Sequence, residues 1–347
     1  MGHAELMTNA SASPHAPVRP EWLADVQEPV LDPRRVIVDP HHHLWDRPGQ
    51  RYLGEELLDD VGAGHRVLAT VYVQCRSMYD LNRPDAFKPV GEVRFAAAIA
   101  EQSPPDVQLC AGIVGGANLL LGSEVAGVLD EMIEVGAGRL CGIRNATAWH
   151  SDSTLISNPI PPPGGILLDP IFGQGILQLT ARDLSLDIWA YHSQLSEVID
   201  LARKHPNQRI ILDHAGGPLG AGPYKGKRNE VFAEWDLSLR ALAQCPNVQI
   251  KLGGLGMRVN GFDLDLRASP PDSTTVAELW GPYLLRCIEI FGVDRCMFES
   301  NFPVDKGMVS YGVLWNAFKK ITADFSEDEK DALFSRNAAK AYRLRLQ

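Results

Sequence analysis

The sequence Val36-Ile-Val-Asp-Pro-His-His-His-Leu-Trp45 joins a short β-branched run to three consecutive histidines. Residues two apart on an extended strand point to the same side. Asp39, His41 and His43 are therefore expected on one face of a strand, while His42 points away. Two imidazoles at the end of a buried strand form half of a metal site, with the carboxylate placed to orient a ligand. The alternatives are a purification-tag remnant or a polar loop, but a tag would lie at a terminus.

The composition is that of an ordinary globular protein. The chain has 347 residues, of which 45% are hydrophobic and 22% charged, and its formal net charge is −10. This charge argues against nucleic acid and anionic membranes as partners, because both favour basic surfaces. A small-molecule substrate is expected, and it can be anionic, since a local cluster of arginine and histidine overrides the global charge. A homodimer is compatible with these features.

The sequence favours a cytoplasmic location. Six cysteines occur singly, without a CxxC pair, which is typical of buried reduced thiols. No apolar run reaches the length of a membrane span, and the first residues lack the basic and apolar regions of a secretory signal. Residues 1–33 are rich in Ala, Pro and Ser without apolar periodicity. They are expected to form a flexible N-terminal extension that can drape over the domain, with His3 and His15 inert.

Residues 34–347 alternate between strand-like and helix-like patterns and are expected to form one catalytic domain. The runs predicted to be strands are Val36–Asp39, Val67–Gln74, Val107–Val114, Leu140–Arg144, Ser185–Tyr191, Arg209–Asp213, Val248–Leu252 and Arg295–Glu299. Helical periodicity lies between them, and Ser326 with Glu329 predicts a capping box for the last helix. Strands separated by helices are expected to be parallel. Eight such units predict an α/β fold of the (β/α)8 TIM-barrel type.

In such a barrel, the chemistry collects at the carboxyl ends of the strands. Many polar residues of this sequence lie at predicted strand ends: His41, His43, Gln74, Arg144, Asn145, Tyr191, His192, Asp213, His214, Lys251, Glu299, Ser300 and Asn301. Each of them alone could be a satisfied core or rim residue. Together they indicate a functional site, because buried charges without partners are too costly to gather there casually.

Four motifs resemble those of the amidohydrolase-related TIM-barrel hydrolases. They are the His-x-His after the first strand, Trp-x-Tyr-His at 189–192, Leu-Asp-His-x-Gly at 212–216 and Met-Phe-Glu-Ser-Asn-Phe-Pro-Val-Asp at 297–305. The resemblance runs from about residue 35 to residue 344, and the branch is that of 2-pyrone-4,6-dicarboxylate lactonase and L-fuconolactonase. Taken jointly, the motifs are specific for the superfamily and weak for the substrate.

The resemblance implies roles for individual residues. His41 and His43 match the metal pair of the first strand, and His192 matches the metal ligand of the fifth. His214 matches a histidine that binds metal or substrate, and Arg144 matches an arginine that anchors a substrate carboxylate. Three neutral imidazoles plus water form an open tetrahedral zinc site, which lowers the pKa of the water towards about 7. The expected cofactor is therefore a divalent metal, Zn²⁺.

The departure from the family lies at the last strand. The family usually places an aspartate there as general base, whereas this sequence has Asn301, whose amide cannot take a proton. Three explanations are open. The base has moved to Glu299 or Asp305; or water activated by the metal attacks directly while a histidine shuttles protons, for which His214 is a candidate; or the activity is reduced or changed in kind.

Two long loops are expected to shape specificity. Ser157–Ile166 carries a run of prolines, and Arg258–Thr275 follows the seventh strand. Long loops over a barrel mouth are usually lids or rims, although surface filler is the alternative. Trp45 and Trp149 next to the site would either wall the pocket or pack in the core.

These observations predict a metal-dependent hydrolase that opens a lactone or related cyclic ester of a small organic acid. The residues expected to bind the substrate are Arg144, Gln74, Tyr191 and His214. One alternative is a metal-dependent decarboxylase of an aromatic or muconate-type acid, which would use the same histidines. Another is a ligand-binding barrel that has lost its catalytic base, and Asn301 is the feature that favours it.

Overall fold

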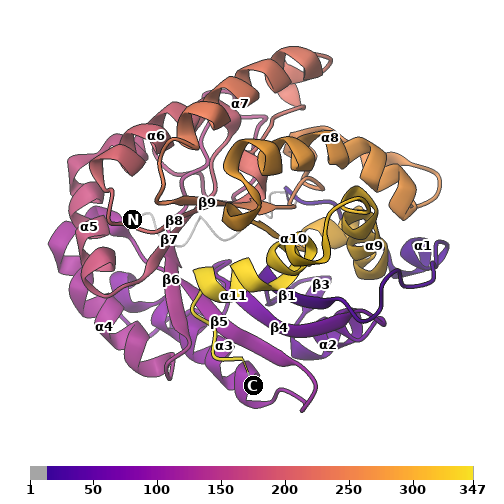
Figure 1. Ribbon diagram of the computed structural model, residues 1–347. Coiled ribbons are helices and arrows are strands. Elements are labelled where there is room, and N and C mark those ends of the chain that lie inside the picture. The colour runs from indigo at the N-terminus through magenta and orange to yellow at the C-terminus, as the bar shows by residue number, and fades with distance from the viewer. Residues whose placement is uncertain (1–13, 347) are drawn as a thin grey trace.

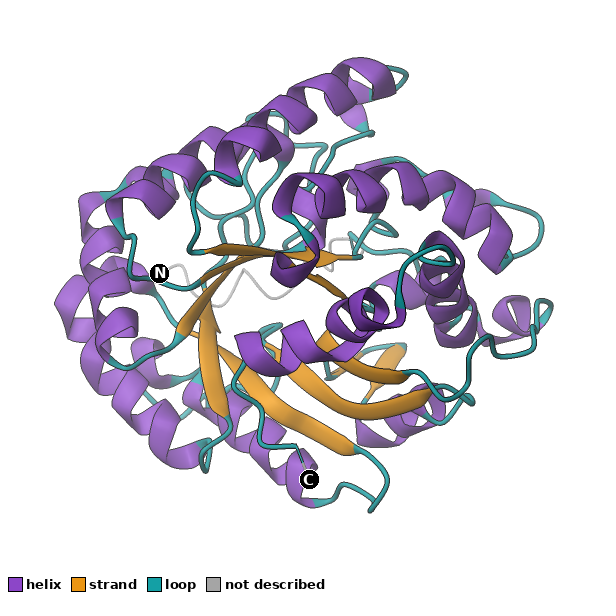
Figure 2. Ribbon diagram, in the orientation of Figure 1, coloured by secondary structure: helices purple, strands orange, loops and turns teal. Residues whose placement is uncertain are grey.

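The computed structural model describes residues 14–346, which form a barrel of parallel strands surrounded by helices (Figures 1 and 2). The strand order around the barrel is β1-β4-β5-β6-β7-β8-β9-β10. The bounds are β1 (Val36–His42), β4 (Arg66–Val73), β5 (Gln108–Gly116), β6 (Leu140–Arg144), β7 (Ser185–Ile188), β8 (Ile210–Leu212), β9 (Val248–Leu252) and β10 (Cys296–Phe298). The eight predicted strands and the TIM-barrel fold are confirmed.

The barrel is nearly closed, and the hydrogen bonds that join its two ends lie at the carboxyl end of β1. Asn301 N donates to the carbonyl of His41 (2.9 Å), and His43 N donates to the carbonyl of Phe302 (2.7 Å). His42 and Phe302 form an isolated parallel bridge. These contacts bring the His-rich stretch and the segment after β10 together, although about 260 residues separate them.

Helices cover the outside of the strands (Figure 2). Their bounds are α1 (Pro20–Ala24), α2 (Gly54–Val61), α3 (Val90–Glu101), α4 (Val125–Val135), α5 (Pro170–Ala181), α6 (Leu195–Lys204), α7 (Arg228–Leu242), α8 (Ser273–Phe291), α9 (Tyr311–Ile321), α10 (Glu327–Asp331) and α11 (Asn337–Ala341). Several begin at a capping side chain, such as Asp169 before α5 and Asp272 before α8. The predicted capping box of Ser326 and Glu329 opens α10.

The C-terminal segment closes one end of the barrel. Figure 1 shows α11 lying across that end. Ala338, Ala341 and Tyr342 are buried and pack in one cluster with interior side chains of the strands, such as Val71 and Val114. This apolar layer separates that end of the barrel from the polar residues at the carboxyl ends of the strands. A small antiparallel pair, β2 (Trp45–Arg47) and β3 (Gln50–Tyr52), follows β1.

The segment 14–33 lies against the barrel and is held by polar contacts. Arg19 Nη2 donates to the carbonyl of Asp265 (2.7 Å), and Glu28 Oε1 accepts from Ser273 N (2.7 Å). Ala16 is buried. The N-terminal extension therefore drapes over the domain in this part, whereas residues 1–13, including His3, lie outside the described residues.

The cysteines are reduced, as the sequence predicts, and the described helices are too short or too polar to span a membrane. The six cysteines are free thiols, and all except Cys75 are buried. Within residues 14–346, no helix combines the length and the apolar character that a membrane crossing requires.

Candidate active site

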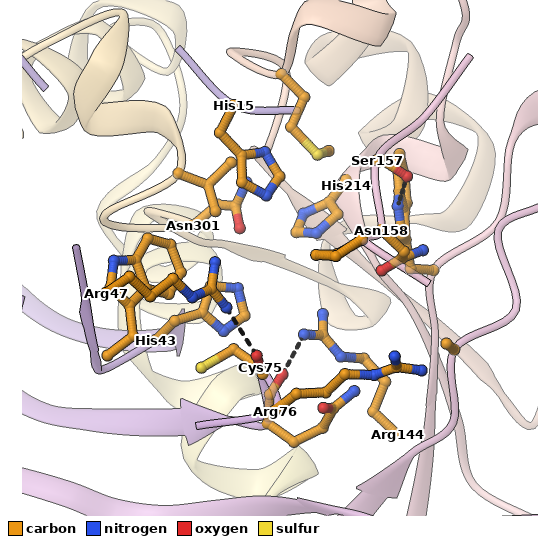
Figure 3. A pocket seen from close by; sticks show the side chains of 17 residues that line it. His15, His43, Arg47, Cys75, Arg76, Arg144, Ser157, Asn158, His214 and Asn301 are labelled. Carbon is orange, nitrogen blue, oxygen red and sulfur yellow. Dashed lines mark hydrogen bonds between the residues drawn. The ribbon is translucent and has the colours of Figure 1, made fainter. Parts of the chain in front are cut away.

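Polar residues from separate strand ends line one pocket (Figure 3). Of the polar residues expected at strand ends, five line it: His43, Gln74, Arg144, His214 and Asn301. The pocket encloses about 580 Å³ of empty space, part of which is open to solvent. The expected clustering at the carboxyl ends of the strands therefore produces a single concave site.

The first-strand histidines have a geometry that fits a metal ion. His43 Nδ1 lies 2.8 Å from the carbonyl of Val73, which can only accept, so Nδ1 carries the proton and Nε2 the lone pair. His41 Nε2 lies 3.3 Å from Arg144 Nη1, which can only donate, so this Nε2 also carries the lone pair; its Nδ1 faces Glu299 Oε2 at 2.8 Å. The two Nε2 atoms are 3.3 Å apart. A tetrahedral zinc ion holds two imidazole nitrogens about 3.3 Å apart.

Both imidazoles are neutral at pH 7, as metal ligands must be. Burial and then His41 hold the pKa of His43 well below its usual value. Burial and then Lys251 lower the pKa of His41. His41, Asp213 and His214 also form a group whose ligand atoms all lie within 4.8 Å of one another. The site can therefore hold a divalent metal.

The structure does not bring His192 to this group. Its ring lies 5.0 Å from that of Tyr224, and its Nε2 lies 3.8 Å from a carboxylate oxygen of Glu234. The ring that does lie beside His41 is that of His214, with 4.6 Å between the centroids. Of the histidines after the fifth and sixth strands, His214 therefore lies beside His41, whereas His192 lies against Tyr224.

Glu299 orients two imidazoles at once. Its Oε1 accepts from the backbone N (3.0 Å) and the Nδ1 (2.7 Å) of His214, while its Oε2 faces Nδ1 of His41. Burial alone would raise the pKa of Glu299, but His214 and His41 outweigh burial and hold the pKa far below its usual value. Glu299 does not line the pocket. It therefore borders the pocket only through the two rings that it contacts.

Asn301 and Asp305 form a second buried pair. Asn301 Nδ2 donates to Asp305 Oδ1 (2.9 Å), and Gly256 N donates to Asp305 Oδ2 (3.1 Å). Asn301 lines the pocket and Asp305 does not, so the amide stands between the carboxyl group and the pocket. Burial raises the pKa of Asp305 to about 7, even though these hydrogen bonds lower it.

Because the pKa of Asp305 is raised, we expect the free energy of unfolding to depend on pH. Between pH 4 and pH 7 folded Asp305 keeps a proton that the unfolded chain releases, so its contribution to stability falls as the pH rises. An Asp305→Asn variant lacks this loss. The difference in unfolding free energy, variant minus parent, should grow by up to roughly 4 kcal/mol from pH 4 to pH 7 and then stay constant. Urea unfolding across this range measures it, and a flat difference would contradict the raised pKa.

A glycine-rich turn after β9 makes room for these groups. Gly254 has φ +66°, and a Cβ on it would lie 2.1 Å from His214 Nδ1. A Cβ on Gly253 would lie 2.3 Å from the carbonyl oxygen of Glu299. Any side chain at either position would push the His214–Glu299 pair out of place.

Lys251 lies on β9 in contact with His41. Its Nζ is 2.9 Å from Asp187 Oδ2, 2.9 Å from Asp213 Oδ1 and 3.1 Å from His41 Nδ1, and the side chain is fully buried. Burial alone would lower its pKa, but the two carboxylates outweigh burial and raise it. A charged ammonium therefore lies between the two carboxylates and beside His41 in the interior of the barrel. Tyr342 donates to the same Asp187 carboxylate.

Three guanidinium groups line the pocket. Arg144 donates to the carbonyl of Gln74 and lies 3.3 Å from His41 Nε2. Arg47 donates to the carbonyl of Cys75 (2.9 Å), and Arg76 also lines the pocket (Figure 3). These groups suit a ligand rich in oxygen atoms or one that develops negative charge.

Some of the loop and aromatic residues that were expected near the site line the pocket, and others do not. Ser157 and Trp45 line the pocket, whereas Trp149 and His150 line a neighbouring cavity of about 520 Å³. Tyr191 does not line the pocket; its hydroxyl lies 2.7 Å from Ser157 Oγ and so supports the loop. His15 was expected to be inert, but it lines the pocket, and its Pro-rich surroundings carry no sequence signal of that.

Comparison with known proteins identifies the family of this chain. The family model described as Amidohydrolase (Amidohydro_2) matches residues 38–344. The chain belongs to this amidohydrolase family. The resemblance noted in the sequence is thereby confirmed.

Relatives of this amidohydrolase cover nearly its whole barrel. It is 33% identical to the uncharacterized protein y4mH of Sinorhizobium fredii, over 89% of this chain and 98% of that protein. It is 26% identical to an L-fucono-1,5-lactonase of Burkholderia multivorans, over 88% of this chain and 96% of the relative. A zinc-bound amidohydrolase structure from Burkholderia multivorans is 25% identical, with a TM-score of 0.68 over 89% of this chain and 99% of that chain.

Proposed function

We propose that this amidohydrolase is a metal-dependent lactonase, which uses water to open the cyclic ester of a small organic acid. The observation that carries the proposal is the position of Glu299. Its Oε1 accepts the Nδ1 proton of His214, so that this ring offers an Nε2 lone pair at the site, while its Oε2 lies 2.8 Å from Nδ1 of His41. The similarity to an L-fucono-1,5-lactonase supports a lactone as the substrate class.

His41 and His43 would hold the metal through their Nε2 atoms. Asp213, whose ligand atom lies within 4.8 Å of those of His41 and His214, would be a candidate for a further ligand. When bound, such an ion supplies Lewis acidity, which polarises a carbonyl group and makes water more acidic. The protein supplies the orientation of the rings: the carbonyl of Val73 fixes His43, and Glu299 fixes His41.

His214 would carry the proton. Its ring enters the pocket, and its Nδ1 proton is held by Glu299 (2.7 Å), so the Nε2 can take a proton from the attacking water. The buried carboxylate stabilises the imidazolium that forms. The same Nε2 can then give the proton to the ring oxygen that leaves as an alkoxide. This assignment makes His214 the base that Asn301 cannot be.

The arginines would bind the oxygen atoms of the substrate. Arg144 lies beside His41 and next to the backbone of Gln74, where a lactone carbonyl or the carboxylate of the opened acid would lie. A planar guanidinium binds such groups through two parallel hydrogen bonds. Asn301 would contribute an amide to the same wall while it covers Asp305.

Removal of the metal tests this proposal. Dialysis against a chelator should abolish the hydrolysis of five- and six-membered lactones, and added Zn²⁺ should restore it. Each ester opened releases one proton at neutral pH, which a pH indicator records. Thermal unfolding of the dialysed protein is the control that its fold is intact. Full turnover without metal would contradict the metal requirement, and no lactone turnover with any divalent ion would contradict the lactonase.

The same assay separates the alternatives. Release of carbon dioxide from an aromatic acid would favour the decarboxylase, and binding of a lactone without turnover would favour a ligand-binding barrel. A homodimer in a cytoplasmic location remains part of the proposal, and sedimentation of the purified protein tests the dimer.

A further inference from the structure

The N-terminal segment 14–33 contributes a residue to the pocket from outside the family domain. The family match begins at residue 38, so this segment is additional to the matched region. His15 nevertheless lines the same pocket as His214 and Asn301 (Figure 3). In Figure 3 its ring faces the pocket from the side opposite Arg144. A substrate between them would therefore contact both side chains.

Close packing fixes the position of His15. The next residue, Ala16, is buried, and its carbonyl oxygen would lie 2.4 Å from a Cβ placed on Gly307. This approach is possible only because Gly307 has no side chain. Arg19 then ties the segment to the carbonyl of Asp265 in the loop Arg258–Thr275. The segment thus contacts both the turn after β10 and the loop Arg258–Thr275.

The chemistry of His15 differs from that of its neighbours. Burial, and then the positive charges of Arg47 and Arg258, lower the pKa of His15 to about 3. The ring is therefore neutral in a pocket that already has three guanidinium groups, those of Arg47, Arg76 and Arg144. A neutral imidazole has one donor and one acceptor, which suits a hydroxyl group better than a second carboxylate.

We infer that His15 contacts the substrate and selects a lactone whose ring carries hydroxyl groups, by hydrogen bonding to one of them. This inference rests on the proposed lactonase and narrows its substrate class. The arginines would bind the ester group and the carboxylate that forms from it. His15 would bind a hydroxyl group on the side of the lactone ring away from Arg144. A site that provides a hydrogen bond to a hydroxyl group discriminates against the analogue that lacks it.

Replacement of His15 tests the inference. His15→Phe keeps a ring of similar size but removes the hydrogen bond, and His15→Asn keeps a donor and an acceptor. With a sugar-acid lactone, His15→Phe should lower kcat/KM about 3- to 10-fold, mainly through KM, which corresponds to one uncharged hydrogen bond. With δ-valerolactone, which has no ring hydroxyl, kcat/KM should not change. His15→Asn should retain most of the preference, and His205→Phe, outside the pocket, should retain all of it.

The outcomes separate this inference from the lactonase proposal. If the parent hydrolyses both lactones and His15→Phe keeps the same preference, the inference is wrong and the lactonase stands. If the parent hydrolyses neither lactone, the lactonase is wrong, and calorimetry with the ring-opened sugar acid decides about His15. Weaker binding of the acid to His15→Phe than to the parent would then support the contact; equal binding, or no binding to either protein, would overturn it.

Discussion

Replacing His214 with glutamine should lower kcat for lactone hydrolysis about 10²- to 10⁴-fold, the usual contribution of a positioned general base. Glutamine can still donate to Glu299, which lies 2.7 Å from Nδ1 in the parent, so the fold is retained. It cannot accept a proton from water. Because the loss concerns proton transfer, kcat should fall while KM changes little. Steady-state kinetics on the metal-loaded variant measures both.

His150→Gln is the matched control for this prediction, since His150 lines the neighbouring cavity that also contains Trp149 and does not line the pocket. It should leave kcat within about twofold, as expected for a residue without contact to the substrate. A second check is Glu299→Gln, which removes the charge that orients His214. If the two residues act as a unit, the double variant should be little slower than His214→Gln alone. A His214→Gln variant that raises KM and leaves kcat unchanged would show a binding role only.

Replacing Lys251 with methionine should destabilise the protein by about 3–5 kcal/mol, the cost of leaving a buried charge without its partner. Here the ammonium lies 2.9 Å from both the Asp187 and the Asp213 carboxylates, and all three side chains are fully buried. Methionine fills the volume but leaves two adjacent negative charges. Urea unfolding near pH 7 measures the loss.

Lys88→Met is the comparison for this prediction, because Lys88 pairs with Asp85, which is 92% exposed. That pair should be worth less than about 1 kcal/mol. In the parent, burial would raise the pKa of Asp213, but Lys251 and then His41 outweigh burial and hold it well below its usual value. The loss in Lys251→Met should therefore shrink at acid pH, where Asp213 in the variant can take up a proton. Equal stabilities of Lys251→Met and the parent at pH 7 would show that this ion network does not stabilise the barrel.

The barrel could be predicted because each strand is an apolar run that ends in polar residues. This pattern placed His41, His43, Arg144 and His214 at one mouth, and they lie together. His192 illustrates the limit of the pattern. The strand was expected to continue to Tyr191, but β7 ends at Ile188, and His192 begins a 3-10 turn directed towards Tyr224. An error of a few residues in a strand end moves the next side chain to a different environment.

Other parts of the site depend on contacts that a linear pattern does not contain. The resemblance to the family implies an aspartate where this sequence has Asn301, but only the fold shows that the amide covers Asp305. Glu299 or Asp305 was expected to handle protons, and only the fold shows that Glu299 lies behind the two rings that it contacts. His15 is placed by the close approach of Ala16 to Gly307, residues almost 300 positions apart, and no local signal could indicate it.

The glycines after β9 have a practical consequence for anyone who wishes to change the specificity of this protein by laboratory evolution. A randomised library that includes Gly253 and Gly254 would consist largely of inactive clones, because every new side chain there displaces the His214–Glu299 pair. Randomising the loop that contains Ser157, together with His15, is the better choice. These residues line the pocket, and changing them does not displace the His214–Glu299 pair.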